Sequence, residues 1–362
     1  MKTGKSLQEM AVELERQAKS KRDFIAPTTQ LEVLEGDVHN GTDPKAQMRQ
    51  GQLRINGQGA FDIGAIGHEQ IQGYTKIPRD YYDRMLTQAP GLLARNVNTW
   101  FRREPNKRMV RTLDGRVRAF PTDKYRPLDN IDLANVGFET LTKMGVRVES
   151  SELTERRMYI KAVTDRLTLE VKKGDVVQAG IVISNSEVAC GSVKVEPLVF
   201  RLVCMNGAIA NDHALRKYHV GRGHGGGDSA EEFFKDETRR ADDRAFWLKV
   251  RDVIEGSFKK DVFERIVARM RETTEREING SIEGAVEVVG DRFGLKEGER
   301  NGVLKWLVKG GDLTQWGLLN AITRTSQEVD DYDRATDMER FGGEVLELPK
   351  QDWELIANAE KN

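Results

Sequence analysis

The residues with the clearest potential for chemistry lie between positions 95 and 126, where cations and aromatic rings alternate. This stretch holds ten lysines and arginines against three carboxylates, a net charge of +7, in a 362-residue chain whose formal net charge is −1. Cationic side chains neutralise phosphates, and neighbouring aromatic rings stack on bases. We therefore expect a nucleic-acid contact made by Trp100, Phe101, Arg102, Arg103, Lys107, Arg108, Arg111, Arg116, Arg118, Lys124, Tyr125 and Arg126.

A hairpin is predicted in the middle of this stretch, with its turn at Asp114-Gly115. An Asp-Gly pair between β-prone segments is typical of a two-residue turn that joins antiparallel strands. Because successive side chains of a strand point to opposite faces, Arg116 and Arg118 would share one face and Val117 the other. Two other interpretations stay open. In the first, the hairpin is a solvated surface with its aromatic rings in the core. In the second, it contacts an acidic protein partner.

A second phosphate contact is suggested by the glycine-rich segment 221–228. Backbone N–H groups of such a segment can bind phosphate. However, the segment lacks the GxxxxGK[ST] pattern, and no strand leads directly into it, so it is not a nucleotide-binding loop of that kind. We interpret it as a flexible hinge at which Arg222 contacts a backbone phosphate.

The two cysteines, Cys190 and Cys204, do not form a CxxC pair and have no neighbouring histidine cluster. A zinc site is therefore not expected, and we expect neither a metal nor a cofactor. Both cysteines fall within the predicted sheet core, so we predict buried free thiols in a reducing cytoplasm. The N-terminus lacks the apolar segment of a signal peptide, and no apolar run is long enough to span a membrane.

Clustered carboxylates occur at Asp330, Asp331 and Asp333. Three aspartates could bind a metal, as a nuclease requires. Because arginines are interspersed among them, the segment 330–341 is better interpreted as an exposed, salt-bridged helix. Gly342-Gly343 is typical of a helix end. We assign no catalytic residue and regard an enzymatic function as less favoured than binding.

The elements that must position these residues are organised around Val176–Met205, the longest apolar and β-branched stretch. Its small polar breaks predict adjacent strands. A hairpin, then a helix over 131–144, then several strands predict an α+β fold with an antiparallel sheet. Four regions are expected: residues 1–94, mostly helical; 95–220, the sheet with its basic hairpin; 221–228, the hinge; and 229–362, helical.

Three stretches together resemble one protein family. They are Lys124–Asn130 (KYRPLDN), the pair Ile183–Ser186 (ISNS) and Phe200–Gly207 (FRLVCMNG), and Trp316–Thr323 (WGLLNAIT). The chain is similar over residues 95–326 to the phage- and plasmid-borne family of unknown function numbered 932. It departs from the family pattern at Ser184–Glu187, where a Ser-His-Asp-Gly-like string is expected. The missing histidine argues against a catalytic role there.

The resemblance implies a mobile-element context near replication and recombination genes. The order of elements is also loosely similar to that of phage single-strand annealing proteins. Our first hypothesis is a cytoplasmic protein that binds single-stranded DNA and anneals strands as a homo-oligomer. The alternatives are a protein that contacts a host factor and a nucleic-acid-processing enzyme that uses the Asp330 cluster or Cys204.

Overall fold

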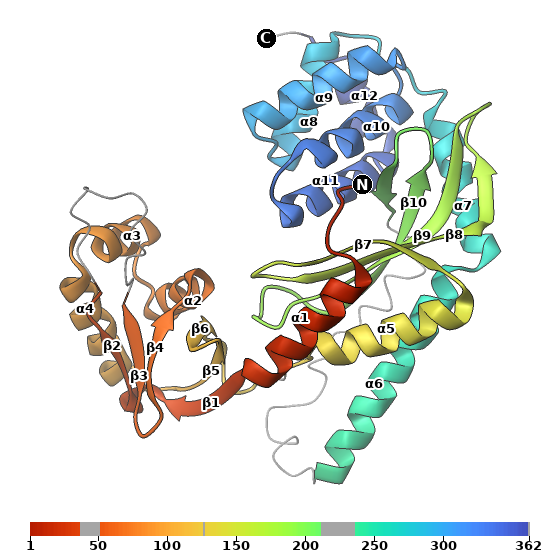
Figure 1. Ribbon diagram of the computed structural model, residues 1–362. Helices are drawn as coiled ribbons and strands as arrows, with labels where there is room; N and C mark the ends of the chain where they lie inside the picture. The colour runs from red at the N-terminus through yellow and green to blue at the C-terminus, as the bar shows by residue number, and fades with distance from the viewer. Residues whose placement is uncertain (37–50, 126, 211–235, 361–362) are drawn as a thin grey trace. The chain divides into compact units, whose positions relative to one another are not determined.

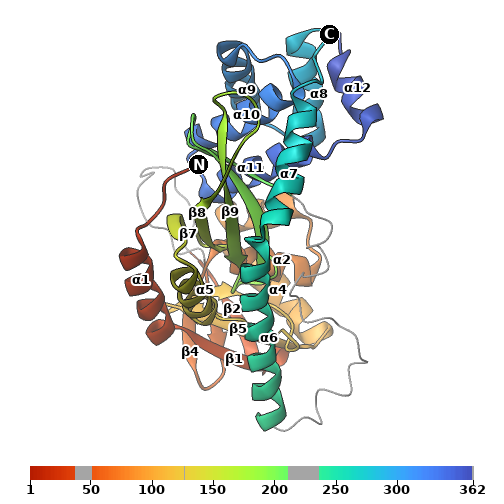
Figure 2. The same ribbon diagram turned by 90° about the vertical axis from the view of Figure 1, so that its right-hand side faces the viewer.

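The computed structural model describes residues 1–36, 51–125, 127–210 and 236–360. The chain forms two compact units, whose helices and strands are drawn in Figures 1 and 2. Unit 1 comprises residues 1–10, 132–185 and 192–362, and unit 2 comprises residues 11–131 and 186–191. Each unit combines helices with a sheet whose strand pairs are almost all antiparallel, so the predicted α+β class is confirmed.

Unit 2 is built on a six-stranded sheet in the order β1-β5-β6-β4-β3-β2. Its strands are β1 (Arg22–Pro27), β2 (Leu31–Leu34), β3 (Gln52–Ile55), β4 (Gly59–Ile63), β5 (Lys107–Leu113) and β6 (Arg116–Ala119). Neighbouring strands are antiparallel except β4 and β6, which are parallel. The predicted hairpin turn is confirmed. Asp114 and Gly115 join β5 to β6 with φ of +53° and +73°, as a two-residue turn requires.

Helices α2 (Ala65–Thr75), α3 (Arg79–Gln88) and α4 (Pro90–Arg103) pack against this sheet. Their shared core contains Leu53 and Val110 from the strands and Ile71, Met85 and Val97 from the helices, all essentially inaccessible to solvent. Residues 1–94 were expected to be mostly helical. They also supply strands β1–β4, which that expectation left out.

Helix α1 (Leu7–Ser20) begins directly after Ser6. The Ser6 hydroxyl accepts the backbone N–H of Glu9, and the Glu9 carboxylate accepts the N–H of Ser6 at 2.8 Å. This reciprocal arrangement satisfies two N–H groups that a helix start otherwise leaves unpaired.

Unit 1 contains a five-stranded antiparallel sheet in the order β11-β10-β9-β8-β7. Its strands are β7 (Arg147–Leu153), β8 (Met158–Glu170), β9 (Val176–Asn185), β10 (Lys194–Arg201) and β11 (Asn206–Ile209), and α5 (Asn130–Met144) precedes them. The strands predicted within Val176–Met205 are therefore confirmed as β9 and β10. Strand β9 is buried along almost its whole length because Val177 and Ala179 join one apolar cluster and Val182 joins another.

The cysteines lie outside these strands, which differs from the prediction. Cys190 is in the segment between β9 and β10, and Cys204 is in the turn between β10 and β11. Neither cysteine forms a disulfide, and both side chains are partly exposed. The reason is that β9 ends at Asn185, before Cys190, and β10 spans Lys194–Arg201, after Cys190 and before Cys204.

The described chain after residue 235 is helical, as predicted for residues 229–362. Its helices are α6 (Asp236–Ser257), α7 (Lys260–Thr273), α8 (Ile282–Phe293), α9 (Glu297–Gly310), α10 (Gln315–Thr325), η4 (Ser326–Glu328), α11 (Tyr332–Leu346) and α12 (Lys350–Ala357). Figures 1 and 2 show α8–α12 gathered at one end of the five-stranded sheet. None of the helices in the described ranges has the length and apolar character that a membrane span needs.

Helix α11 corrects one prediction, because it continues through Gly342-Gly343 and ends at Leu346. These glycines serve close packing within unit 1. A Cβ on Gly343 would lie 1.8 Å from the carbonyl oxygen of Ile209, and one on Gly342 would lie 2.3 Å from a methyl group of Thr323. Only a residue without a side chain fits at either position.

Candidate nucleic-acid interface

All described residues of the predicted nucleic-acid contact belong to unit 2. Arg126 and Arg222 lie outside the described residues, as does the hinge 221–228. The other predicted residues come from the end of α4, from β5 and β6, and from the segment that follows β6. The structure separates them into an exposed set and a buried set.

The exposed set follows the last turns of α4 and the start of the hairpin. Arg102 and Arg103 are in the last turn of α4, Lys107 opens β5 and Arg116 opens β6. All four side chains are exposed, and so is Arg95, seven residues before Arg102 and on the same side of the helix. None of the five makes an ion pair or a side-chain hydrogen bond with any residue in the described part of the chain. Lys124, farther along, is also exposed.

The aromatic residues divide in a way that corrects the prediction. Phe101 is fully buried and stacks on Phe120, with 5.7 Å between the ring centroids. It is therefore a core residue and cannot stack on a base. Trp100 is half-buried, and its indole N–H donates to Asn96 at 3.0 Å. It is the predicted base-stacking residue that lies on the same helix as the exposed Arg102 and Arg103.

Arg108 is also held within unit 2. Its guanidinium lies 5.0 Å from the ring centroids of both Tyr74 and Phe120, and it donates to the Phe120 carbonyl at 2.8 Å. Burial lowers its pKa from the ordinary value of an arginine. Its positive charge interacts with these two aromatic faces, although the side chain keeps some exposure.

Arg111 has no exposed surface, and so the expectation that it contacts phosphate is not supported. Its guanidinium donates to both carboxylate oxygens of Asp23 at 2.9 Å, to Asp129 at 3.3 Å and to the Glu187 carbonyl at 2.6 Å. Burial alone would lower the pKa of Arg111, but these carboxylates outweigh it and raise the pKa. The physical reason for the correction is the segment 186–191, which covers this face of the hairpin within unit 2.

Arg118 belongs to the same partly buried charge network. It pairs with Glu187 at 2.6 Å, and the other Glu187 oxygen accepts the backbone N–H of Asn130 at 2.6 Å. Lys21 pairs with Asp129. Burial alone would raise the pKa of Asp129, but Lys21 and Arg111 hold it below its ordinary value. Three cations therefore face three carboxylates, and the network carries no surplus charge for a ligand.

This network explains two of the sequence motifs. The Tyr125 hydroxyl donates to the Ser186 carbonyl at 3.1 Å, and Asn130 contacts Glu187, so Lys124–Asn130 and Ser184–Glu187 are brought together. Glu187 stands where the resemblance noted from the sequence led us to expect another residue. Here its carboxylate supplies the partner that Arg118 needs.

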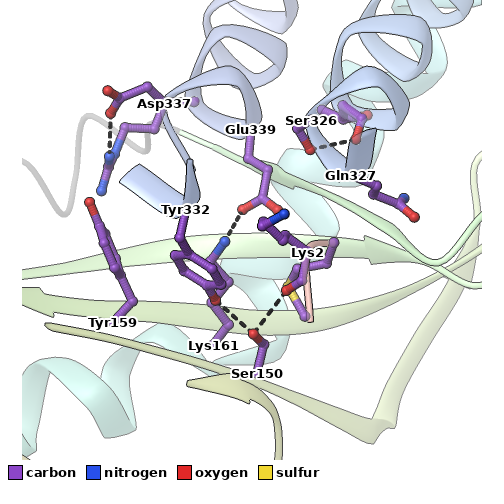
Figure 3. A network of polar contacts seen from close by, with 12 residues as sticks. Lys2, Ser150, Tyr159, Lys161, Ser326, Gln327, Tyr332, Asp337 and Glu339 are labelled. Carbon is purple, nitrogen blue, oxygen red and sulfur yellow. Dashed lines mark hydrogen bonds and ion pairs between the residues drawn. The ribbon is translucent and has the colours of Figure 1, made fainter. Parts of the chain in front are cut away.

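A second network, in unit 1, was not anticipated from the sequence (Figure 3). Lys161 on β8 and Glu339 on α11 form a fully buried ion pair at 2.6 Å, and Lys161 lies 4.7 Å from the ring centroid of Tyr332. The Tyr332 and Ser150 hydroxyls are 2.6 Å apart, and Ser150 donates to the Lys2 carbonyl at 2.9 Å. Burial lowers the pKa of Lys161. Both charged groups are inaccessible to solvent, so the network fixes the packing of α11 on the sheet. It offers no open site for a ligand.

The remaining motifs also meet in unit 1. Arg201 makes a two-pronged ion pair with Asp175, whose carboxylate accepts the indole N–H of Trp316 at 2.9 Å. Asn206 donates to Thr323 at 2.6 Å. A cavity with room for about one water molecule is lined by apolar side chains together with Arg201, Asn206, Trp316 and Thr323. The motif residues therefore join the sheet to α10.

Two of the three carboxylates considered for an enzyme serve the fold. Asp331 accepts the backbone N–H of Arg334 at 2.8 Å and so caps α11, and Asp333 accepts the Tyr159 hydroxyl at 2.7 Å. Over the described ranges, no group of three His, Cys, Asp or Glu side chains is arranged to hold a metal ion.

Comparison with known protein families gives a match. The sequence profile of the family described as "Domain of unknown function (DUF932)" matches residues 119–341, more than half of the chain. No curated protein and no solved structure matches. The matched range includes Glu187 and Lys161 but begins after the exposed cations of α4 and β5.

Proposed function

The chain belongs to the DUF932 family, and we propose that this member is a nucleic-acid-binding protein that engages single-stranded DNA through α4 and the start of β5. One observation carries the proposal. Arg95, Arg102, Arg103 and Lys107 are exposed and make no ion pair with a described residue, although the chain as a whole has slightly more acidic than basic side chains. Such cations are available to neutralise phosphates.

The arrangement of these cations supports a bound strand. Arg95 and Arg102 are two turns apart on one side of α4, and Lys107 follows four residues after Arg103. A backbone with regularly spaced phosphates can run along such a row. Arginines in the last turn of a helix also interact favourably with its carbonyl end. This interaction explains Arg102 and Arg103 but not Arg95 or Lys107, which lie outside the last turn.

Preference for single strands is proposed from Trp100. Its half-buried indole lies three residues before Arg103 and therefore on the same side of α4, so a base could stack on its exposed part while that cation holds the phosphate. An origin on a phage or plasmid is a further proposal, supported by the family resemblance. Annealing of complementary strands is another, supported by the order of hairpin (β5–β6), helix (α5) and sheet (β7–β11).

The test is fluorescence anisotropy with a labelled thymine oligonucleotide at several salt concentrations. The variant Arg102→Ala/Arg103→Ala/Lys107→Ala should weaken binding roughly tenfold or more. It should also make the salt dependence shallower by about 2 in log–log slope, since each lost phosphate contact removes about 0.7. Competition with duplex DNA measures the strand preference.

The matched control removes three exposed cations from unit 1, as Lys173→Ala/Arg244→Ala/Lys249→Ala. It lowers the net charge equally, so it should reproduce only the weak, general effect of charge. Equal losses in the two triple variants, or none in either, would overturn the proposed interface.

A further inference from the structure

The turn between β10 and β11 displays three apolar side chains to solvent. Leu202, Val203 and Met205 are 37%, 61% and 52% exposed. Met205 also has φ of +52°, a left-handed conformation that is unfavourable for a residue with a side chain. Single exposed apolar residues are common, but several on one short turn form a patch that usually contacts something.

Cations lie directly beside this turn. Arg324 of α10 reaches the Cys204 carbonyl at 3.4 Å, and Gln327 donates to the Cys204 and Met205 carbonyls at 3.2 and 3.3 Å. The turn is thus held against the end of α10 and η4. The guanidinium of Arg324 also lies 4.7 Å from the ring centroid of Trp306 on α9, which extends the surface to that helix.

Two lysines complete the basic part of the surface. The ammonium groups of Lys305 and Lys309 lie 4.9 and 4.8 Å from the Trp306 ring centroid. The carboxylate close to them is Glu328, which accepts the indole N–H at 3.0 Å and pairs with Lys305 at 3.4 Å. Three cations and one carboxylate leave a positive surplus next to the apolar turn.

We propose that this surface docks an acidic peptide segment with apolar side chains. Carboxylates of the peptide would pair with Lys305, Lys309 and Arg324, and its apolar side chains would cover Val203 and Met205. A nucleic acid fits less well. The turn offers no aromatic ring, and the indole of Trp306 is already flanked by three cations and bonded through its N–H. The proposal is independent of the DNA contact of unit 2.

The experiment uses the full chain and a short fluorescein-labelled peptide of alternating aspartate and leucine. The variants Val203→Asp and Lys309→Glu should each weaken binding by about tenfold, because each removes a central contact and adds like-charge repulsion. A peptide with lysine in place of aspartate should bind Lys305→Glu/Lys309→Glu better than the unaltered chain. Matched controls are Leu355→Asp, at a 70% exposed leucine of α12, and Lys249→Glu on α6. Both should bind like the unaltered chain.

Three results would overturn the proposal. The first is no binding of the aspartate peptide. The second is an equal loss in the control variants. The third is a loss of oligonucleotide rather than peptide binding in Val203→Asp, which would assign the surface to nucleic acid. The Arg102 triple variant keeps this test separate, since it should bind the peptide normally whether or not unit 2 binds DNA.

Discussion

At the residue scale, Arg111 and Arg102 show how differently two arginines of one basic stretch are used. Arg111 is enclosed by Asp23, Asp129 and the Glu187 carbonyl, whereas Arg102 is exposed. A buried guanidinium with satisfied donors stabilises the fold only as long as its partners are present, and the reverse holds for the partners. Substitution of Arg111 should therefore lower the stability of the fold, whereas substitution of Arg102 should weaken oligonucleotide binding.

We predict that Arg111→Met lowers the free energy of unfolding by about 3 kcal/mol, because it leaves the Asp23 and Asp129 carboxylates without their shared partner in a partly buried site. Urea unfolding measures the loss. The oligonucleotide affinity of the folded fraction should stay unchanged. Arg111→Lys keeps the charge but not the two-pronged geometry. Its free energy of unfolding should therefore lie between those of the unaltered chain and Arg111→Met. A variant as stable as the unaltered chain with much weaker DNA binding would show that Arg111 reaches the ligand after all.

At the element scale, local sequence signals predicted what depends on neighbouring residues and missed what depends on distant ones. The Asp114-Gly115 turn and the Ser6 helix start were predictable because each is decided within four residues. The role of Gly343 was not, since it depends on the carbonyl of Ile209, more than a hundred positions away. A glycine pair at a helix end and one at a close approach look the same in a single sequence.

The same limit applies to the candidate sites. Composition alone located the exposed Arg102, Arg103 and Lys107. It could not separate them from Arg111, because the segment that covers Arg111 lies some 75 positions farther along the chain. Lys161 gave one available signal, a lysine inside the apolar run RMYIKAV. A buried lysine of this kind requires a carboxylate, but the sequence does not say that it is Glu339.

One link between helices gives a pH-dependent prediction. Arg334 of α11 donates to both carboxylate oxygens of Glu299 on α9, at 2.8 and 2.6 Å, and this hydrogen bonding lowers the pKa of Glu299 despite its burial. The folded state then binds the Glu299 proton more weakly than the unfolded state does. The link contributes stability above the unfolded pKa of about 4.5, and the contribution is lost as pH falls through the lower folded value.

Glu299→Gln should therefore be less stable than the unaltered chain at pH 7, and the difference should shrink as the pH falls below about 4.5. Urea midpoints over this range measure it. Glu297→Gln, two residues earlier in the same helix turn and exposed, is the matched control and should show almost no difference at either pH. If the stability difference between Glu299→Gln and the unaltered chain were constant with pH, the ion pair would not be its cause.

At the scale of the whole molecule, the chain divides differently from the four consecutive regions expected from the sequence. Unit 2 takes most of residues 11–131 and adds 186–191, so the boundary near residue 131 falls inside the region expected to span 95–220. Each unit has its own hydrophobic core. The core around Leu53 contains only unit 2 residues, and the large helical core around Leu307 contains only unit 1 residues.

Separate cores predict separate unfolding. Differential scanning calorimetry should resolve two transitions, because a cooperative unit extends as far as its shared packing. Leu53→Ala and Leu307→Ala each empty a fully buried site, at a cost of about 2–5 kcal/mol, and each should lower the transition of its own unit only. Bound oligonucleotide should raise the transition that Leu53→Ala lowers, since a ligand stabilises the unit that holds it. The aspartate–leucine peptide should raise the other transition. A single transition that both substitutions lower equally would show that the two cores unfold as one.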